Sequence, residues 1–315
     1  MGFLFVMYVM SFYMVFESND WFMVWVGLEI NMMMFVVIMF ERYNMLNIES
    51  CFSYFFIQSL GSAIFMSLFY IKLENLDFIL SVVLSLKMGA GPFFIWFPSV
   101  CSGISWVSCF ILMTIQKILP LVLISIFVSE IFFFIVFVSL MGGVAGSFNQ
   151  LNLKQLMAYS SVYHLGWIFL CIKMSGVSWV MYLVMYIIMI FPVIFYFMKS
   201  GIECLSDMSS DKVSFWMVIM MLSMAGMPPF LGFFLKWFAF VEIMNISMFY
   251  MLIMVFCSIL MFYVYFRVVY DVLMGYYCYG SWGKWFLKDS GKFKLDLICM
   301  MGMLIGMIFI VFLLL

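Results

Sequence analysis

The stretch WFMVWVGLEINMMMFVVIMF, residues 21–40, decides the class of fold, because it is almost entirely apolar. Its only ionisable side chain is Glu29, near its middle. A helix needs about 20 predominantly apolar residues to cross the hydrocarbon core of a bilayer. The rest of the chain has the same character, since 68% of its 315 residues are hydrophobic and 9% are charged. This composition predicts that lipid, rather than water, surrounds most of the protein.

Dividing the chain at charges, Asn and Gly gives about eleven apolar segments of spanning length. They are too long and too continuously apolar for barrel strands, which alternate, so we predict an all-α polytopic membrane protein without a soluble domain. The N-terminal MGFLFVMYVM resembles neither a signal peptide nor a presequence, so we interpret it as a mature helix. The segments lie near residues 2–16, 21–40, 50–70, 77–98, 104–127, 130–147, 153–171, 177–198, 213–241, 247–270 and 296–315.

Basic residues in the connections predict the orientation of these helices, because cytoplasmic or matrix loops carry more Lys and Arg. The side opposite the N-terminus carries only Lys72 and Lys173. We therefore expect the N-terminus on the matrix or cytoplasmic side and the C-terminus on the other. The basic residues on the N-terminal side are Arg42, Lys154, Lys199, Lys212, Arg267, Lys284, Lys288, Lys292 and Lys294.

Several function classes do not fit the sequence. A net charge of −1 gives no reason to expect a nucleic-acid partner or a basic membrane-surface patch. The eight cysteines include no CxxC pair or ferredoxin-like run, so we interpret them as buried, inert thiols. One histidine cannot supply the paired axial ligands of a b-type haem. We therefore predict no metal or redox cofactor on this chain.

A few ionisable groups remain at membrane depth once the connections are set aside. A charge at the centre of a bilayer costs about 2.5–3.5 kcal/mol even on the mildest scale, so such groups mark functional sites by default. Snorkelling or a misplaced segment boundary is the alternative, and it fits Lys236 best because that residue lies nearest a helix end. His164 fits a packing role equally well. The candidates are Glu29, Lys87, Lys117, Lys236 and His164.

Two predicted spans are interrupted by glycine and proline next to a lysine. SLKMGAGPFFIWFP (85–98) has its interruption just after Lys87, and LSMAGMPPFLGFFLKW (222–237) just before Lys236. Broken helices in corresponding positions are typical of transporter sites built from inverted repeats, although ordinary proline kinks remain an alternative. The interrupting residues are Gly89, Gly91 and Pro92 in the first and Gly226, Pro228, Pro229 and Gly232 in the second.

The spacing of the two breaks predicts the organisation of the chain. Residues 1–127 and 130–270 are expected to form two inverted five-helix repeats with one discontinuous helix each, and residues 271–315 a loop and a C-terminal helix. Burial favours the neutral form of a lysine, whereas a nearby carboxylate favours the protonated form. We therefore expect Glu29 and Lys87 to act as a switching pair that passes protons towards Lys117. A static salt bridge is the alternative.

Five stretches resemble the chain 2 family of NADH:ubiquinone oxidoreductase, antiporter-like subunits of respiratory complex I. They occur in order along the chain, and as a set they are specific, although residues after about 245 carry no matching motif. The stretches are WVGLEIN (25–31), LKMGAGPFFIWFP (86–98), ILMTIQKILP (111–120), FNQLNLKQLMAYSSVYHLGW (148–167) and MAGMPPFLGFFLKW (224–237).

This resemblance implies a membrane-arm subunit in the mitochondrial inner membrane, with its N-terminus towards the matrix. It implies eleven helices, chain 4L and chain 4 as neighbours, contact with membrane lipids, and NADH, flavin, iron–sulfur clusters and quinone bound by partner subunits. It also implies that Glu29, Lys87, Lys117 and Lys236 carry protons, with a less settled role for His164. A stand-alone cation/proton antiporter and a passive scaffold are the alternative functions.

Overall fold

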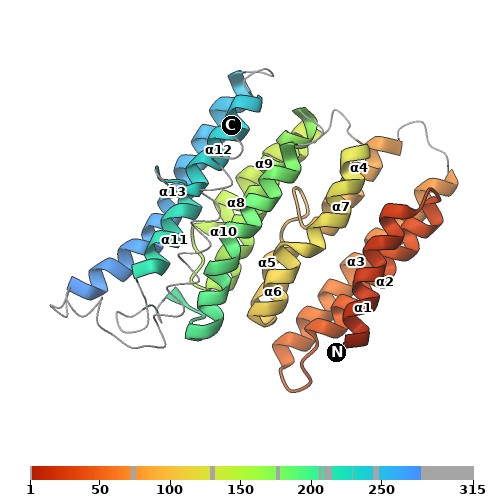
Figure 1. Ribbon diagram of the computed structural model, residues 1–315, viewed down its shortest axis with the longest axis horizontal. Coiled ribbons are helices and arrows are strands. Elements are labelled where there is room, and N and C mark those ends of the chain that lie inside the picture. Colours follow the sequence, from red (N-terminus) through yellow and green to blue (C-terminus); the bar gives the residue numbers. More distant parts are fainter. Residues whose placement is uncertain are drawn as a thin grey trace. The chain divides into compact units, whose positions relative to one another are not determined.

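The computed structural model describes residues 2–71, 76–127, 132–174, 178–205, 208, 215–228, 230–243 and 248–277. Within these ranges the regular elements are helices, and one isolated antiparallel bridge joins Asn152 and Cys204 (Figure 1). The predicted all-helical class is thus confirmed for this part of the chain. The predicted C-terminal span 296–315 and most of the loop before it lie outside the described residues. Contacts divide the chain into two compact units.

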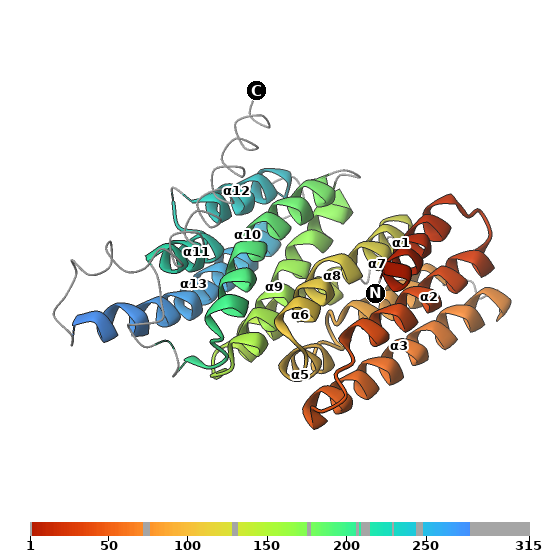
Figure 2. The same ribbon diagram turned by 60° about the horizontal axis from the view of Figure 1, so that its bottom comes forward.

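The first unit comprises Met1–Gly143 and Ser161–Gly166. Its first three helices lie side by side in Figures 1 and 2, and α4 packs on both α3 and α7. The central turns of α9 also belong to this unit. Its helices are α1 Gly2–Glu17, α2 Trp21–Met39, α3 Met45–Ile71, α4 Leu76–Met88, α5 Trp96–Gly103, α6 Trp106–Met113, α7 Ile115–Ile126, most of α8 Phe132–Ser147 and the middle of α9 Leu153–Met174.

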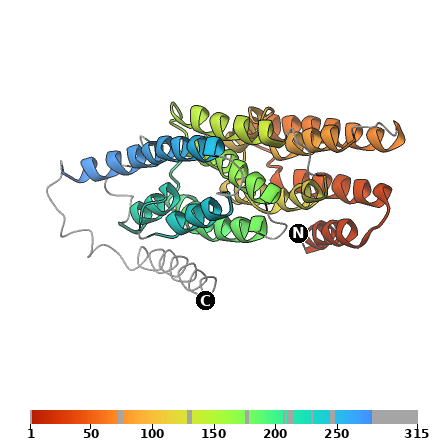
Figure 3. The same ribbon diagram turned by 90° about the horizontal axis from the view of Figure 1, so that it is seen from above.

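The second unit comprises Val144–Ser160 and Trp167–Leu315. Besides the two ends of α9 it contains α10 Ser178–Ser200, α11 Phe215–Ala225, α12 Leu231–Ile243 and α13 Met248–Tyr277. α11 packs against α10, α12 and α13, and Figure 3 shows the long α13 running beside α11.

Both helix interruptions predicted from glycine and proline are present. The predicted span 77–98 stops as a helix at Met88, and Gly89 turns the chain with φ of 65°. The predicted span 213–241 stops at Ala225, where Gly226 has φ of 84°, and helix resumes at Leu231. Glycine adopts this left-handed conformation at little cost, whereas most other residues rarely do, so the positions of these two glycines favour helix ends here. Pro229 lies outside the described residues.

The predicted segment 104–127 is present as the apolar stretch Trp106–Ile126, but Thr114 interrupts it and divides it into α6 and α7. Thr114 has φ of −121° and ψ of −75°, outside the helical range. Its hydroxyl donates to the Phe110 carbonyl one turn earlier at 2.7 Å, a side-chain bond that competes with the helical backbone and bends helices. Residues 99–103, which lie between two of the predicted segments, form the end of α5.

Helix length and composition indicate a multi-pass membrane protein. Five described stretches are long and apolar enough to cross a bilayer, and α1 and α8 contain shorter apolar helices. Large apolar side chains such as Phe52 and Phe56 lie about 60% exposed, as lipid-facing residues do. The five spanning stretches are Trp21–Met39, Met45–Tyr70, Trp106–Ile126, Ser178–Ser200 and Met248–Tyr270.

The connection between α8 and α9 is held by charged side chains of the second unit. Arg267 on α13 donates to the carbonyls of Phe148 and Gln150, the latter at 3.1 Å. Lys154 on the first turn of α9 forms an ion pair with Glu203 at 2.8 Å, beside the bridge between Asn152 and Cys204. These bonds join three segments that are distant in sequence and satisfy loop carbonyls that no helix can pair.

Replacing Arg267 with Met should lower the stability of the protein by about 3 kcal/mol, because two hydrogen bonds from a charged donor are lost and each contributes about 1.5–3 kcal/mol. Thermal denaturation in detergent measures the effect. Lys199→Met is the matched control. Lys199 is exposed, and the contact described for its ammonium is with the ring of Phe195 on the same helix. Equal denaturation midpoints for the two variants would contradict this role of Arg267.

Candidate functional site

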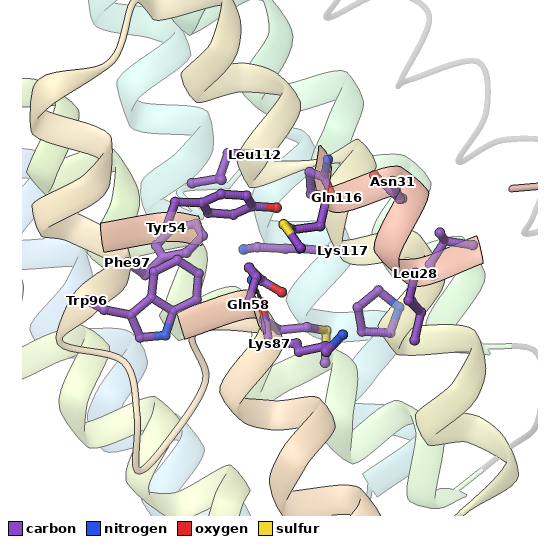
Figure 4. A pocket seen from close by; sticks show the side chains of 14 residues that line it. Leu28, Asn31, Tyr54, Gln58, Lys87, Trp96, Phe97, Leu112, Gln116 and Lys117 are labelled. Atoms are coloured by element: carbon purple, nitrogen blue, oxygen red, sulfur yellow. Dashed lines mark hydrogen bonds between the residues drawn. The ribbon is translucent and has the colours of Figure 1, made fainter. Parts of the chain in front are cut away.

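A small polar cavity inside the first unit brings Lys87 and Lys117 together (Figure 4). Its volume is about 30 Å³, room for roughly two water molecules. Both lysines line it, and they are only 6% and 4% exposed. The remaining lining residues come from α2, α3, α4, α5, α6 and α7, and the polar ones among them are Asn31, Tyr54, Gln58, Trp96 and Gln116.

The carbonyls released at the end of α4 are bonded by neighbouring side chains. The Gln58 amide on α3 donates to the Lys87 carbonyl at 2.7 Å, and the Trp96 indole donates to the Leu86 carbonyl at 3.2 Å. In a membrane such carbonyls must find partners within the protein. The break is therefore a stable part of the fold, and Lys87 stands at its edge with its own backbone already paired.

Glu29 lies in the middle of α2 and accepts a hydrogen bond from the Ser62 hydroxyl of α3. The structure shows no ion pair within 4 Å between Glu29 and Lys87, although both lie in described helices. Instead α3 packs on both α2 and α4. Gly61 faces the Lys87 side chain so closely that a Cβ atom there would lie 3.0 Å from Lys87 Cγ. One turn of α3 thus contacts both charged residues.

Lys117 lies just after the Thr114 interruption and reaches across to α9. Its ammonium donates to the Ser161 carbonyl at 3.3 Å and stands 4.9 Å from the centre of the Phe97 ring. His164 is buried three residues further along α9, on the same face as Ser161. The structure therefore places four of the sequence-predicted site residues, Glu29, Lys87, Lys117 and His164, in the first unit.

Lys236 belongs to the second unit and has a different environment. Its ammonium donates to the Ala225 carbonyl, the last of α11, at 2.7 Å, and the side chain is 7% exposed. An apolar cavity of about 270 Å³ adjoins it. The lining residues are Ala225, Gly226, Phe233, Trp237, Phe240, Ser258, Ile259 and Phe262, together with Lys236 itself.

Neutral polar residues of the first unit were missed by reasoning from charge alone. Asn31 Oδ1 and Gln116 Nε2 are buried, line the small cavity and have no hydrogen-bond partner in the protein. Buried polar atoms of this kind are normally bonded, often to water, when the site is polar and large enough. The sequence did contain a signal for these residues, because side-chain amides are uncommon inside otherwise apolar helices. Gln58 and Gln116 both lie near predicted mid-membrane positions.

This arrangement can bind water and move protons within the first unit. An amide such as Gln58 orients a water molecule but does not change its own protonation, whereas lysine and glutamate do. Two lysines on one hydrated cavity can therefore exchange a proton through water when the stability of their charged forms changes. Such proton exchange between the two lysines needs no redox group near the cavity.

The chain is similar in sequence to known proteins. Residues 70–262 match the family model described as NADH:quinone oxidoreductase/Mrp antiporter, TM. NADH-ubiquinone oxidoreductase chain 2 of Anopheles gambiae is 35% identical over 260 residues, 76% of each chain. The same protein of Locusta migratoria is 33% identical over 246 residues, 73% of this chain and 72% of that one.

Solved structures share the fold. A chain of respiratory complex I from Thermus thermophilus superposes with a TM-score of 0.76 at 20% identity, covering 85% of this chain and 69% of that one. A chain of the Mrp complex from Dietzia sp. gives 0.73 at 15% identity, covering 86% and 59%. The chain belongs to the NADH:quinone oxidoreductase/Mrp antiporter family of transmembrane proteins, and within it to the NADH-ubiquinone oxidoreductase chain 2 proteins.

Proposed function

We propose that this chain is a membrane-arm subunit of respiratory complex I and takes part in proton translocation coupled to electron transfer from NADH to ubiquinone. The observation that carries the proposal is the pair of buried lysines, Lys87 and Lys117, on one polar cavity in a member of the chain 2 family. Buried lysines at membrane depth are costly and are kept where their charge is used.

Within the first unit, Glu29 controls the charge of Lys87 through the intervening turn of α3. Loss of the carboxylate's influence leaves a desolvated lysine that favours its neutral form, so a proton passes through water in the cavity to Lys117. The Ser161 carbonyl holds the ammonium of Lys117, and His164 lies near the onward route along α9. Lys236 serves the second unit as a further carrier.

The finer organisation follows the resemblance. The chain forms eleven transmembrane helices, with inverted repeats at 1–127 and 130–270 and a C-terminal loop and helix at 271–315. It lies in the mitochondrial inner membrane with its N-terminus in the matrix and contacts chain 4L, chain 4 and membrane lipids. Flavin, iron–sulfur clusters and quinone are bound by partner subunits, and this chain contributes no redox site to the enzyme.

A stand-alone cation/proton antiporter is the second candidate, favoured by the Mrp part of the family description. The purified chain reconstituted alone in vesicles discriminates the two. Cation-driven proton flux would support the antiporter, whereas our proposal expects none. A passive scaffold is the third possibility, but a purely structural function does not explain why two buried lysines line one cavity.

Replacing Lys117 with Met keeps the length of the side chain but removes the proton carrier. The complex should assemble, while NADH-driven proton pumping falls at least about tenfold, since a positioned acid–base group typically contributes about 10²–10⁴-fold. The ratio of protons pumped to electrons transferred in vesicles measures it. Lys199→Met is the control. A normal ratio in an assembled Lys117→Met complex would remove Lys117 from the path.

Replacing Gly226 with Ala tests the position of Lys236. The new Cβ would lie 2.7 Å from Lys236 Nζ, so the ammonium must leave the Ala225 carbonyl and pumping should fall. Gly201→Ala is a matched control, because Gly201 also has positive φ, 64°, but no atom lies within 4 Å of its added Cβ. Both variants carry backbone strain of roughly 1–2 kcal/mol. Equal pumping in the two would contradict a role for Lys236 at this place.

Replacing Glu29 with Gln removes the charge and keeps the size of the side chain. If Glu29 controls Lys87, coupled turnover should slow while the subunit remains assembled, which a native gel stained for NADH dehydrogenase activity shows alongside the pumping assay. If the carboxylate only stabilises helix packing, the subunit should instead fail to assemble. Normal pumping in the assembled variant would exclude both roles.

A further inference from the structure

We propose that Ser62 is a positioning residue that holds Glu29 in each of its two protonation states, an inference that rests on the proposed function. The serine lies on α3, is 1% exposed, and is bonded directly to the Glu29 carboxyl. No other residue described in this site contacts Glu29 through a side-chain hydrogen bond.

The Ser62 hydroxyl has two acceptors within reach but a single proton. It approaches Glu29 Oε1 on α2 and, at 2.9 Å, the Ser59 carbonyl of its own helix. A hydroxyl donates one hydrogen bond and accepts up to two. It can therefore donate to only one of these acceptors at a time, and the protonation of Glu29 decides which one.

With Glu29 ionised, the Ser62 O–H donates to the carboxylate, a charge-assisted bond of the stronger kind. With Glu29 protonated, the carboxyl O–H donates to Ser62 Oγ, and the Ser62 proton turns to the Ser59 carbonyl. No bond is lost in either state and Ser62 keeps its proton. The carboxyl group thus changes charge without moving and without leaving a buried polar atom unpaired, which would be costly.

The same turn of α3 reaches Lys87. Gln58 donates to the Lys87 carbonyl, and Gly61, next to Ser62, is in contact with the Lys87 side chain. Ser62 and Gly61 are consecutive and so face different neighbours, Glu29 on α2 and Lys87 on α4. The turn at residues 58–62 is therefore the physical connection between two charged residues that form no direct ion pair.

The test compares four variants of the assembled complex: Ser62→Ala, Ser59→Ala, Glu29→Gln and the Glu29→Gln, Ser62→Ala double variant. Ser59→Ala is the matched control, because it removes a serine hydroxyl one turn earlier on the same helix. That hydroxyl is exposed and donates to the Phe56 carbonyl. The substitution keeps the Ser59 carbonyl, which accepts from Ser62. NADH-driven proton pumping in vesicles is measured per assembled complex, together with the infrared carboxyl band that Glu29→Gln abolishes.

Ser62→Ala should slow pumping about tenfold and shift the Glu29 carboxyl band, because a strong bond to the carboxyl group is lost. Ser59→Ala should change neither. The double variant should pump no more slowly than Glu29→Gln alone, since Ser62 acts through Glu29. A purely structural serine would instead slow the double variant by the product of the two single effects and leave the band unmoved.

The outcomes separate this inference from the proposed function. Slow pumping in Glu29→Gln with normal pumping in Ser62→Ala overturns the role of Ser62 and leaves that of Glu29. Normal pumping in Glu29→Gln overturns the proposed role of Glu29 itself. Failure of Ser62→Ala to assemble would assign Ser62 to packing and overturn the inference as well.

Discussion

The structure depends on one constraint: a charged or polar group inside the hydrocarbon region must be satisfied by the protein or by enclosed water. Lys117 meets it with the Ser161 carbonyl and the face of Phe97, and Glu29 meets it with the Ser62 hydroxyl. Asn31 and Gln116 leave buried atoms for which the protein supplies no partner, next to a cavity of water size. The constraint thus indicates where water enters the interior.

The two helix interruptions meet the same constraint in different ways. At the first, Gln58 and Trp96 bond the released carbonyls, so the charge of Lys87 is not needed to stabilise the break. At the second, the ammonium of Lys236 itself bonds the Ala225 carbonyl. A change in the charge of Lys236 therefore disturbs its helix end directly, whereas Lys87 can change its charge while its helix end stays paired.

Much of the fold could be predicted from the sequence, because apolar length and the glycine and proline positions act locally. The division of residues 106–126 at Thr114 could not be predicted. The sequence does not show whether a threonine hydroxyl donates to a carbonyl of its own helix. The candidate site residues were chosen by their charges, which are conspicuous in apolar segments. The roles of Ser62, Asn31 and Gln116 depend on contacts between α2, α3 and α7 that no local pattern specifies.

The central claim is that water in the first unit connects Lys87 to Lys117. A structure of the assembled complex at a resolution that shows ordered water tests it most directly. The account predicts water in the cavity, bonded to Asn31 Oδ1 and Gln116 Nε2 and within hydrogen-bond reach of at least one lysine ammonium. A dry cavity, with apolar side chains closed between the two lysines, would contradict it.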